Sequence, residues 1–183
     1  LPDALAAALG TGSGPGLVML APGEALAAAR ARITQPLDGV DVVIATSGSP
    51  DGRGHRVGLG LPAMLASARA TLARLGGPGQ WLTSLPVHHV AGFQVVLRSA
   101  VAGIPPMVHT PDGSFGAAAL ADSIARLEAG VPHYLSLVPT QLARLLEQDP
   151  RPLTAFRAIL VGGAPLPSML ADRARRAGVR LVT

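Results

Sequence analysis

Short apolar stretches alternate with segments of helical pattern along most of this chain, and this alternation constrains the fold more than any other feature. The stretches that have the length and apolar character of buried strands are 17–20, 42–45, 57–59, 81–85, 107–109, 134–138, 158–161 and 179–182. Helices are expected between most of them, at 24–33, 61–75, 90–101, 140–147, 167–177 and around Leu120, Ile124 and Leu127. Repeated strand–helix alternation predicts an α/β fold, with a layered, largely parallel sheet and helices on its faces. The stretch 57–59 can return beside 42–45 as a hairpin.

The composition is that of one globular domain or of a large part of one. The chain has 183 residues, 49% of them hydrophobic, which is enough to bury a core. Its net charge is +4, and its 15 basic residues are all arginine, spread along the chain except for a group at 173–180. A nucleic-acid face would be denser and interleaved with aromatic residues, so we expect no nucleic-acid partner.

Several kinds of site and location are not expected from this sequence. It has no cysteine, which excludes disulfides, thiol catalysis and cysteine-based zinc sites. No apolar run approaches the roughly 18 residues that span a bilayer, and residues 1–10 do not resemble a secretory signal. We therefore expect a cytoplasmic protein with no membrane partner, and the composition leaves homo-oligomer formation open.

A polar, glycine-containing loop directly follows the stretch 42–45. It begins Thr46-Ser47-Gly48-Ser49 and continues to Arg56. Backbone N–H groups and hydroxyls that are exposed together at a strand end can bind phosphate. The loop is not a Walker P-loop, because the pattern G-x-x-x-x-G-K-[ST] is missing. Taken alone, an ordinary surface turn is the simpler interpretation.

Two further loops also follow predicted strands. His88 and His89 lie between a strand end and a helix start, where they can orient a carboxylate or shape a pocket. The alternative is a helix-capping loop with one histidine packed and one exposed, and no third ligand lies at a spacing that supports a metal site. The run Gly162-Gly163-Ala164 lets a flat ligand or another backbone approach closely, or forms a turn that needs positive φ.

Ligands of parallel sheets bind beyond the carboxyl ends of the strands. All three loops, 46–56, 86–92 and 162–165, are placed there by the predicted order of elements. We therefore expect them to share one site.

In their order and separations, the three loops resemble successive core motifs of the adenylate-forming acyl-CoA ligase superfamily. The motifs are T-S-G-[ST] at 46–49, L-P-x-x-H-x-x-G at 85–92 and V-G-G-A-P at 161–165. Residues 70–99 and 135–145 are similar to the o-succinylbenzoate–CoA ligases of menaquinone biosynthesis, in their actinobacterial form. The resemblance covers roughly residues 36–183.

The resemblance implies a two-step reaction. ATP, with Mg²⁺, activates a small carboxylate such as o-succinylbenzoate to an acyl-adenylate and releases pyrophosphate; the thiol of coenzyme A then displaces AMP. It implies that the pyrophosphate end of ATP is bound by Thr46, Ser47, Gly48, Ser49 and Gly52.

The acyl and adenine parts are assigned in the same way. The resemblance implies that His89 lines the acyl pocket near the reacting carboxylate, with His88 beside it and Arg98 contributing to the field of the pocket. It also implies that Gly162, Gly163 and Ala164 border the adenine and the acyl group, Gly163 being in reach of both.

The first loop departs from the family pattern T-S-G-[ST]-T-G-x-P-K-G. Pro50-Asp51 replaces T-G with one residue inserted, so that His55 falls where the lysine is expected and Arg56 where the glycine is expected. A histidine is mostly neutral at pH 7, and loss of a charged donor to phosphate costs on the order of 1.5–3 kcal/mol. Arg53 or Arg56 can restore the positive charge, although a guanidinium is not equivalent to an ammonium.

We expect residues 1–183 to be a partial N-terminal, adenylate-forming domain without its C-terminal lid domain. The family's acidic motif and adenylation lysine would follow Thr183, so the chain is expected to be inactive by itself. The alternative is a degenerate, non-catalytic homologue that acts as an acyl- or nucleotide-binding module or as a protein-interaction module.

Overall fold

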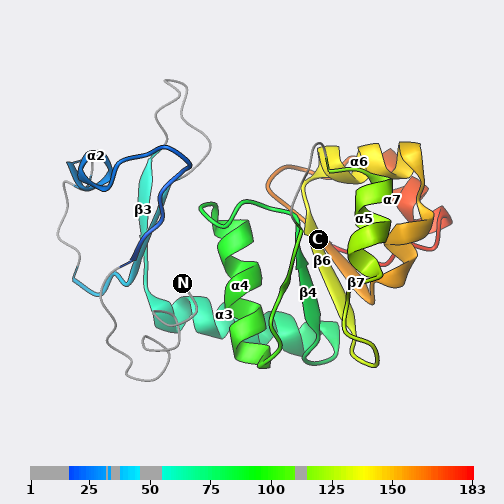
Figure 1. The fold of residues 1–183 in the computed structure, drawn as a ribbon, viewed down its shortest axis with the longest axis horizontal. Helices are drawn as coiled ribbons and strands as arrows, with labels where there is room; N and C mark the ends of the chain where they lie inside the picture. The colour runs from blue at the N-terminus through cyan, green and yellow to red at the C-terminus, as the bar shows by residue number, and fades with distance from the viewer. Residues whose placement is uncertain (1–16, 32, 34–37, 46–54, 110–114) are drawn as a thin grey trace.

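The structure is a computed structural model that describes residues 17–31, 33, 38–45, 55–109 and 115–183 (Figure 1). Its strands are β1 (Leu17–Val18), β2 (Val42–Ala45), β3 (Arg56–Leu59), β4 (Gln80–Thr83), β5 (Met107–Val108), β6 (His133–Leu137), β7 (Ala158–Val161) and β8 (Leu181–Val182). Its helices are α2 (Leu26–Ala31), α3 (Leu61–Leu75), α4 (Val90–Ala102), α5 (Ala117–Ile124), α6 (Pro139–Gln148), the 3-10 helix η1 (Arg151–Ala155) and α7 (Ser168–Arg176). In the described part of the chain, no helix combines the length and apolar character needed to cross a membrane.

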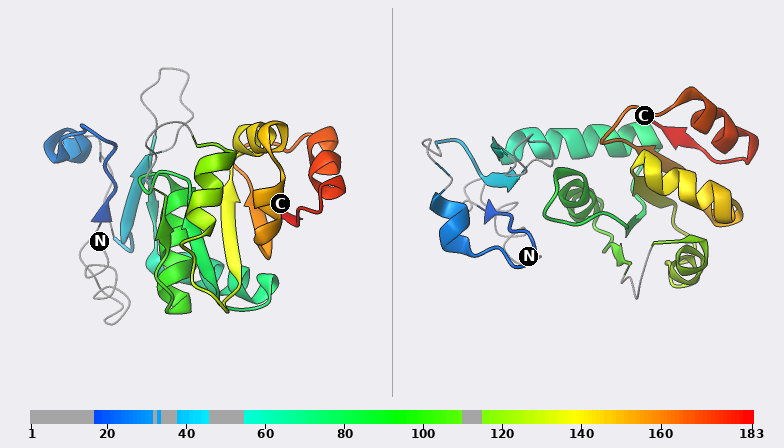
Figure 2. Two further views of the ribbon diagram at one scale, coloured as in Figure 1. Left: turned by 45° about the vertical axis from the view of Figure 1, so that its right-hand side comes forward. Right: turned by 90° about the horizontal axis from the view of Figure 1, so that it is seen from above.

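The larger sheet is parallel throughout, in the order β5-β4-β6-β7-β8. Successive residues of a strand point to opposite faces. Leu82 and Leu135, which are paired in the register, pack with α5, α6 and α7, whereas the next pair, Trp81 and Tyr134, packs with α3 and α4. Both faces are therefore covered by helices (Figure 2), as is usual for parallel sheets. The predicted α/β fold is confirmed.

The helices α3 and α4 lie between the larger sheet and a smaller one (Figure 1). On α4, Phe93 and Leu97 are one helical turn apart and pack in the cluster that contains Ile44 of β2. Val95, on another side of α4, packs in the cluster that contains Trp81 of β4. Because α4 is apolar toward both sheets, it is buried between them and its position determines how far apart they lie.

The smaller sheet has the order β1-β2-β3. β1 runs parallel to β2, and β3 returns antiparallel to β2 with Arg56 opposite Ala45, which confirms the predicted hairpin. The alternation predicts one largely parallel sheet, and the structure divides the strands between two. The physical reason is the two-sided apolar character of α4, which needs a sheet on each side.

Candidate functional site

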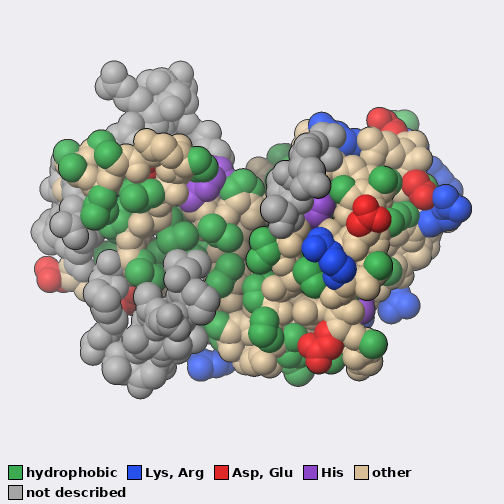
Figure 3. All heavy atoms as spheres, in the orientation of Figure 1, with side chains coloured by type: hydrophobic (Ala, Val, Ile, Leu, Met, Phe, Trp, Pro, Cys, Tyr) green, Lys and Arg blue, Asp and Glu red, His purple; other side chains and the backbone are tan. Residues whose placement is uncertain are grey.

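The first cavity of interest lies where the two sheets face each other. We call it the histidine cavity; its volume is about 570 Å³. It is lined by Ile44, Ala45, Val57, Leu59, Leu85, Pro86, His89, Val90, Ala91, Val138, Gln141 and Gly163. In the space-filling view, the surface is hollowed between the part that contains the smaller sheet and the part that contains the larger sheet (Figure 3). The end of β2, the loop after β4 and the loop after β7 thus meet at one cavity.

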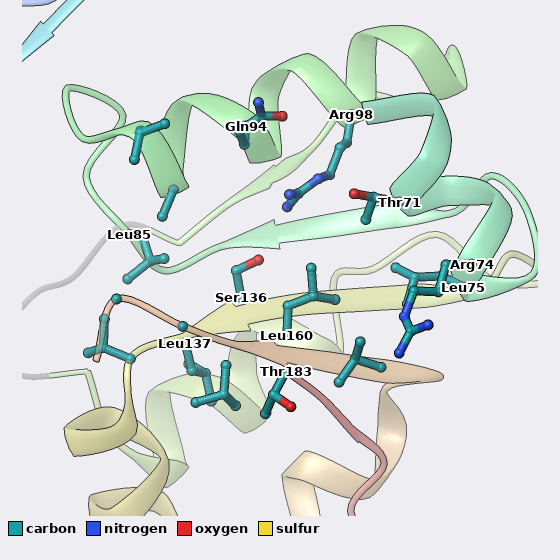
Figure 4. A pocket seen from close by; sticks show the side chains of 17 residues that line it. Thr71, Arg74, Leu75, Leu85, Gln94, Arg98, Ser136, Leu137, Leu160 and Thr183 are labelled. Carbon is teal, nitrogen blue, oxygen red and sulfur yellow. The ribbon is translucent and has the colours of Figure 1, made fainter. Parts of the chain in front are cut away.

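A second cavity, of about 370 Å³, lies between α4 and the larger sheet (Figure 4). We call it the arginine cavity because Arg98 reaches into it from α4. Its lining includes Thr71, Gln94, Ser136 and Thr183. Leu85, Val90, Ala91, Val138 and Gly163 line both cavities, so the two adjoin.

Three polar groups in the arginine cavity are buried without a hydrogen-bond partner among the described residues. They are Nε of Arg98, Oε1 of Gln94 and Oγ of Ser136. Burial lowers the pKa of Arg98, because desolvation disfavours its charge. The guanidinium is 5.1 Å from the ring centroid of Trp81, a cation–π contact that partly offsets this desolvation. Unsatisfied buried polar groups around one cavity indicate a ligand with hydrogen-bonding atoms of its own.

The histidine pair lies at the start of α4. His89 is the N-cap residue of α4, and its N–H donates a hydrogen bond to the carbonyl oxygen of Pro86 (3.1 Å). The rings of His88 and His89 are stacked at an angle, with centroids 4.3 Å apart. Burial lowers the pKa of His88, the neighbouring His89 lowers it further, and Glu24 acts in the opposite direction. His89 lines the histidine cavity, whereas His88 lines neither of the two cavities.

Gly92 determines how closely α4 approaches the loop after β4. A Cβ atom at Gly92 would lie 2.2 Å from the carbonyl oxygen of Pro86, far inside contact distance. Only glycine therefore allows the first turn of α4 to pack on this backbone. This close approach places His89 at the cavity.

The glycines after β7 differ in their surroundings. Gly163 has φ +83°, a left-handed conformation that favours glycine, and lines both cavities. Gly162 lines the arginine cavity, and its N–H donates to the carbonyl oxygen of Leu137 (3.2 Å). Ala164 is exposed and lines neither cavity.

The first polar loop falls mostly outside the described residues, including Thr46, Ser47, Gly48, Ser49, Gly52 and Arg53. His55 is described and exposed. Arg56 is buried in β3, where its guanidinium pairs with Glu24 and donates to the carbonyl oxygen of Met19 (3.2 Å). A direct contact of Arg56 with phosphate would therefore require this ion pair to separate.

Gln94, Ser136 and Gln141 are polar residues of the two cavities that the sequence analysis missed. Gln94 and Arg98 are four residues apart on one face of α4, a spacing that could have indicated Gln94. Ser136 lies between two leucines of β6, a weaker signal. Gln141 accepts a hydrogen bond from the N–H of Val138 (3.0 Å) and donates to the carbonyl oxygen of Ser84 (3.3 Å), which gives it a structural role as well.

Within the described residues, no three histidine, aspartate or glutamate side chains gather in a group that could hold a metal ion. The polar side chains of the two cavities are instead the guanidiniums of Arg74 and Arg98, amides, hydroxyls and an imidazole. Such groups bind and orient anionic and carbonyl oxygens.

The comparisons with known proteins agree with this arrangement. The family model described as AMP-binding enzyme matches residues 24–183. A Mycobacterium tuberculosis protein named "Probable 2-succinylbenzoate--CoA ligase" is 36% identical over 174 residues, which are 93% of this chain and 45% of the relative. A 2-succinylbenzoate–CoA ligase of Escherichia coli K12 is 37% identical over 120 residues, 64% of this chain and 24% of the relative. The chain spans less than half the length of these relatives.

A solved structure shows the same fold. It is o-succinylbenzoate CoA synthetase (MenE) from Bacillus subtilis in complex with the acyl-adenylate intermediate OSB-AMP. Its TM-score is 0.67 at 30% identity, over 80% of this chain and 29% of that chain. These matches confirm the resemblance inferred from the three motifs, and the family match covers far more than half of the sequence. The chain belongs to the AMP-binding enzyme family.

Proposed function

We propose that this chain forms the acyl- and nucleotide-binding part of an acid–CoA ligase, which activates 2-succinylbenzoate with ATP and transfers it to coenzyme A. The names of the relatives support this activity. The two adjoining cavities support it as well, because an acyl-adenylate has an acyl part and a nucleotide part that need neighbouring sites. The named relatives also favour a ligase over a non-catalytic module of the same family.

The observation that carries the proposal is the placement of Arg98. 2-Succinylbenzoate has two carboxylates, and activation removes the charge of only one of them. The other stays negative and needs a cation in the acyl pocket. Arg98 supplies that cation beside Gln94 and Ser136, whose buried oxygens have no hydrogen-bond partner among the described residues. We assign the arginine cavity to the acyl part and the histidine cavity to the nucleotide.

The reacting carboxylate belongs at the junction of the cavities. One of its oxygens attacks the α-phosphorus of ATP and pyrophosphate leaves; the thiol of coenzyme A then attacks the acyl carbon and AMP leaves. His89 lies on the wall of the histidine cavity, where a ring N–H can orient a carboxylate oxygen. Gly163 lines both cavities and leaves room at the junction for the mixed anhydride.

The remaining assignments rest on the family motifs. Thr46, Ser47, Gly48, Ser49, Gly52, Arg53 and His55 stay predicted ligands of the phosphates. Gly162 and Ala164 stay predicted neighbours of the adenine and the acyl group, and His88 stays a predicted neighbour of the acyl group. We assign no residue of this chain to Mg²⁺ or to coenzyme A.

Isothermal titration calorimetry of the chain with 2-succinylbenzoate tests the assignment of Arg98. We expect Arg98→Gln to weaken binding tenfold or more, because a charge-assisted hydrogen bond contributes about 1.5–3 kcal/mol. Arg69→Gln is the matched control: Arg69 is exposed on α3 and lines neither cavity. Equal affinity of Arg98→Gln and the unsubstituted chain would remove Arg98 from the acyl site.

A further inference from the structure

A buried ion pair links β3 to the turn between β1 and α2. The guanidinium of Arg56 pairs with Glu24 and donates a hydrogen bond to the carbonyl oxygen of Met19 (3.2 Å). The Arg56 and Glu24 side chains are only 7% and 17% exposed. The other carboxylate oxygen of Glu24 accepts a hydrogen bond from the N–H of Ala21 (3.2 Å). The pair therefore fixes the start of β3 to residues 19–24.

The residues on either side of this pair belong to the histidine cavity. Val57 follows Arg56 in β3, and Ala45 lies opposite Arg56 in β2. Both Ala45 and Val57 line the cavity. A displacement of Arg56 would move both of them, because backbone hydrogen bonds join the two strands.

The charge of Glu24 also reaches the histidine pair at the start of α4. Its negative charge acts on His88, whose ring is 4.3 Å from that of His89. His89 lines the histidine cavity. Glu24 thus acts on both Arg56 of β3 and the histidine pair, although it lines neither cavity itself.

Arg56 is poorly placed to act as a mobile phosphate ligand. Removing one partner of a buried ion pair leaves an uncompensated charge, which is strongly unfavourable. A phosphate at the two terminal nitrogens would have to replace Glu24 and the carbonyl oxygen of Met19, and the third nitrogen, Nε, is buried. The geometry favours a fixed role for the arginine.

We propose that Glu24 is a positioning residue for the nucleotide: through Arg56 it holds the Ala45–Val57 wall of the histidine cavity in place. Arg56 then shapes the nucleotide site without touching phosphate. This inference rests on the proposed function, because it takes the histidine cavity as the nucleotide site.

The affinity for ATP of the Glu24→Gln chain, measured by titration calorimetry, distinguishes the two roles of Arg56. If Glu24 positions the wall, Glu24→Gln weakens ATP binding by about tenfold, as does Arg56→Met, and the double variant is no weaker than the worse single variant. If Arg56 is instead a phosphate ligand held back by Glu24, Glu24→Gln releases it and ATP binds more tightly. Tighter or unchanged ATP binding by Glu24→Gln would overturn the proposal.

Two further measurements separate positioning from a loss of fold and from a failure of the proposed function. Hydrogen exchange of peptides that cover Ala45 and Val57 should be faster in Glu24→Gln, while peptides from β6 and β7 keep their protection. The affinity for 2-succinylbenzoate should stay within about twofold, because Arg98 is untouched.

If Glu24→Gln does not fold, the conservative Arg56→Lys, which keeps the charge, should fold and bind ATP more tightly than Arg56→Met. Equal ATP affinity of Arg56→Lys and Arg56→Met would also overturn the proposal. If the unsubstituted chain does not bind 2-succinylbenzoate, the proposed function itself is refuted.

Discussion

At the scale of single residues, the arginine cavity combines a charge with buried groups that lack partners. Arg98 lies over Trp81, and its Nε has no hydrogen-bond partner among the described residues. Leaving a buried donor unsatisfied costs about 1–3 kcal/mol, which is similar in size to the roughly 2 kcal/mol that a desolvated cation–π contact contributes, so the contact with Trp81 leaves little net stabilisation. An arginine in this setting is better explained by ligand binding than by stability.

Some of these residues were predictable from the sequence and others were not. His89 and Gly163 belong to motifs with recognisable spacing, Arg98 lies on the helix after the histidines, and the structure places all three on the cavities. Ser136 lies between two leucines of β6, where the sequence does not show which face of the sheet will border a cavity. The ion pair of Arg56 joins residues 32 positions apart, and such a contact depends on the fold.

The pKa of His88 gives a test at this scale. Burial is the largest cause that lowers this pKa and His89 lowers it further, whereas Glu24 raises it. The unfolded chain therefore binds the proton more readily, and stability is lost as the pH falls below 6.5, the ordinary value, until the lowered pKa is passed. We expect His88→Gln to reduce the loss of unfolding free energy between pH 7.5 and pH 5.5, as measured by urea unfolding at both values. An equal loss of unfolding free energy in His88→Gln and in the unsubstituted chain would contradict a lowered pKa of His88.

At the scale of elements, the start of α4 lies where the two cavities adjoin, because Val90 and Ala91 line both of them. Most element positions followed from apolar patterning, and 42–45 and 158–161 have the predicted bounds. The 3-10 helix η1 was not predicted, because a five-residue segment with a proline has no helical repeat to detect. Nor could the two sheets be separated from the sequence, since the alternation of strands and helices is the same for one sheet or two.

Substitution of Gly92 tests whether the position of α4 depends on its close approach to the backbone of Pro86. Gly92→Ala should lower the free energy of unfolding by about 1–3 kcal/mol, because its Cβ would overlap the carbonyl oxygen of Pro86. This cost exceeds the gain of about 1 kcal/mol that alanine brings to a helix interior. Gly162→Ala is the matched control for chemical denaturation: a Cβ there meets nothing within 4 Å. Equal stability of the two variants would show that α4 does not depend on the close approach.

At the scale of the whole molecule, the layers bring segments far apart in sequence to one place. The histidine cavity joins the smaller sheet to the loops that follow β4 and β7, and the arginine cavity continues from it beneath α4. This continuity is the physical basis for assigning one ligand to both. An acyl-adenylate would occupy the two cavities at once, and each of its parts alone would occupy one.

Competition calorimetry tests this central claim most directly, with a non-hydrolysable sulfamoyl analogue of the 2-succinylbenzoyl adenylate as the ligand. The account predicts that the analogue binds the chain more tightly than 2-succinylbenzoate or ATP. It also predicts that each of these two, added separately at saturation, lowers the apparent affinity of the analogue. An analogue that is displaced by only one of them, or by neither, would contradict a site that spans both cavities.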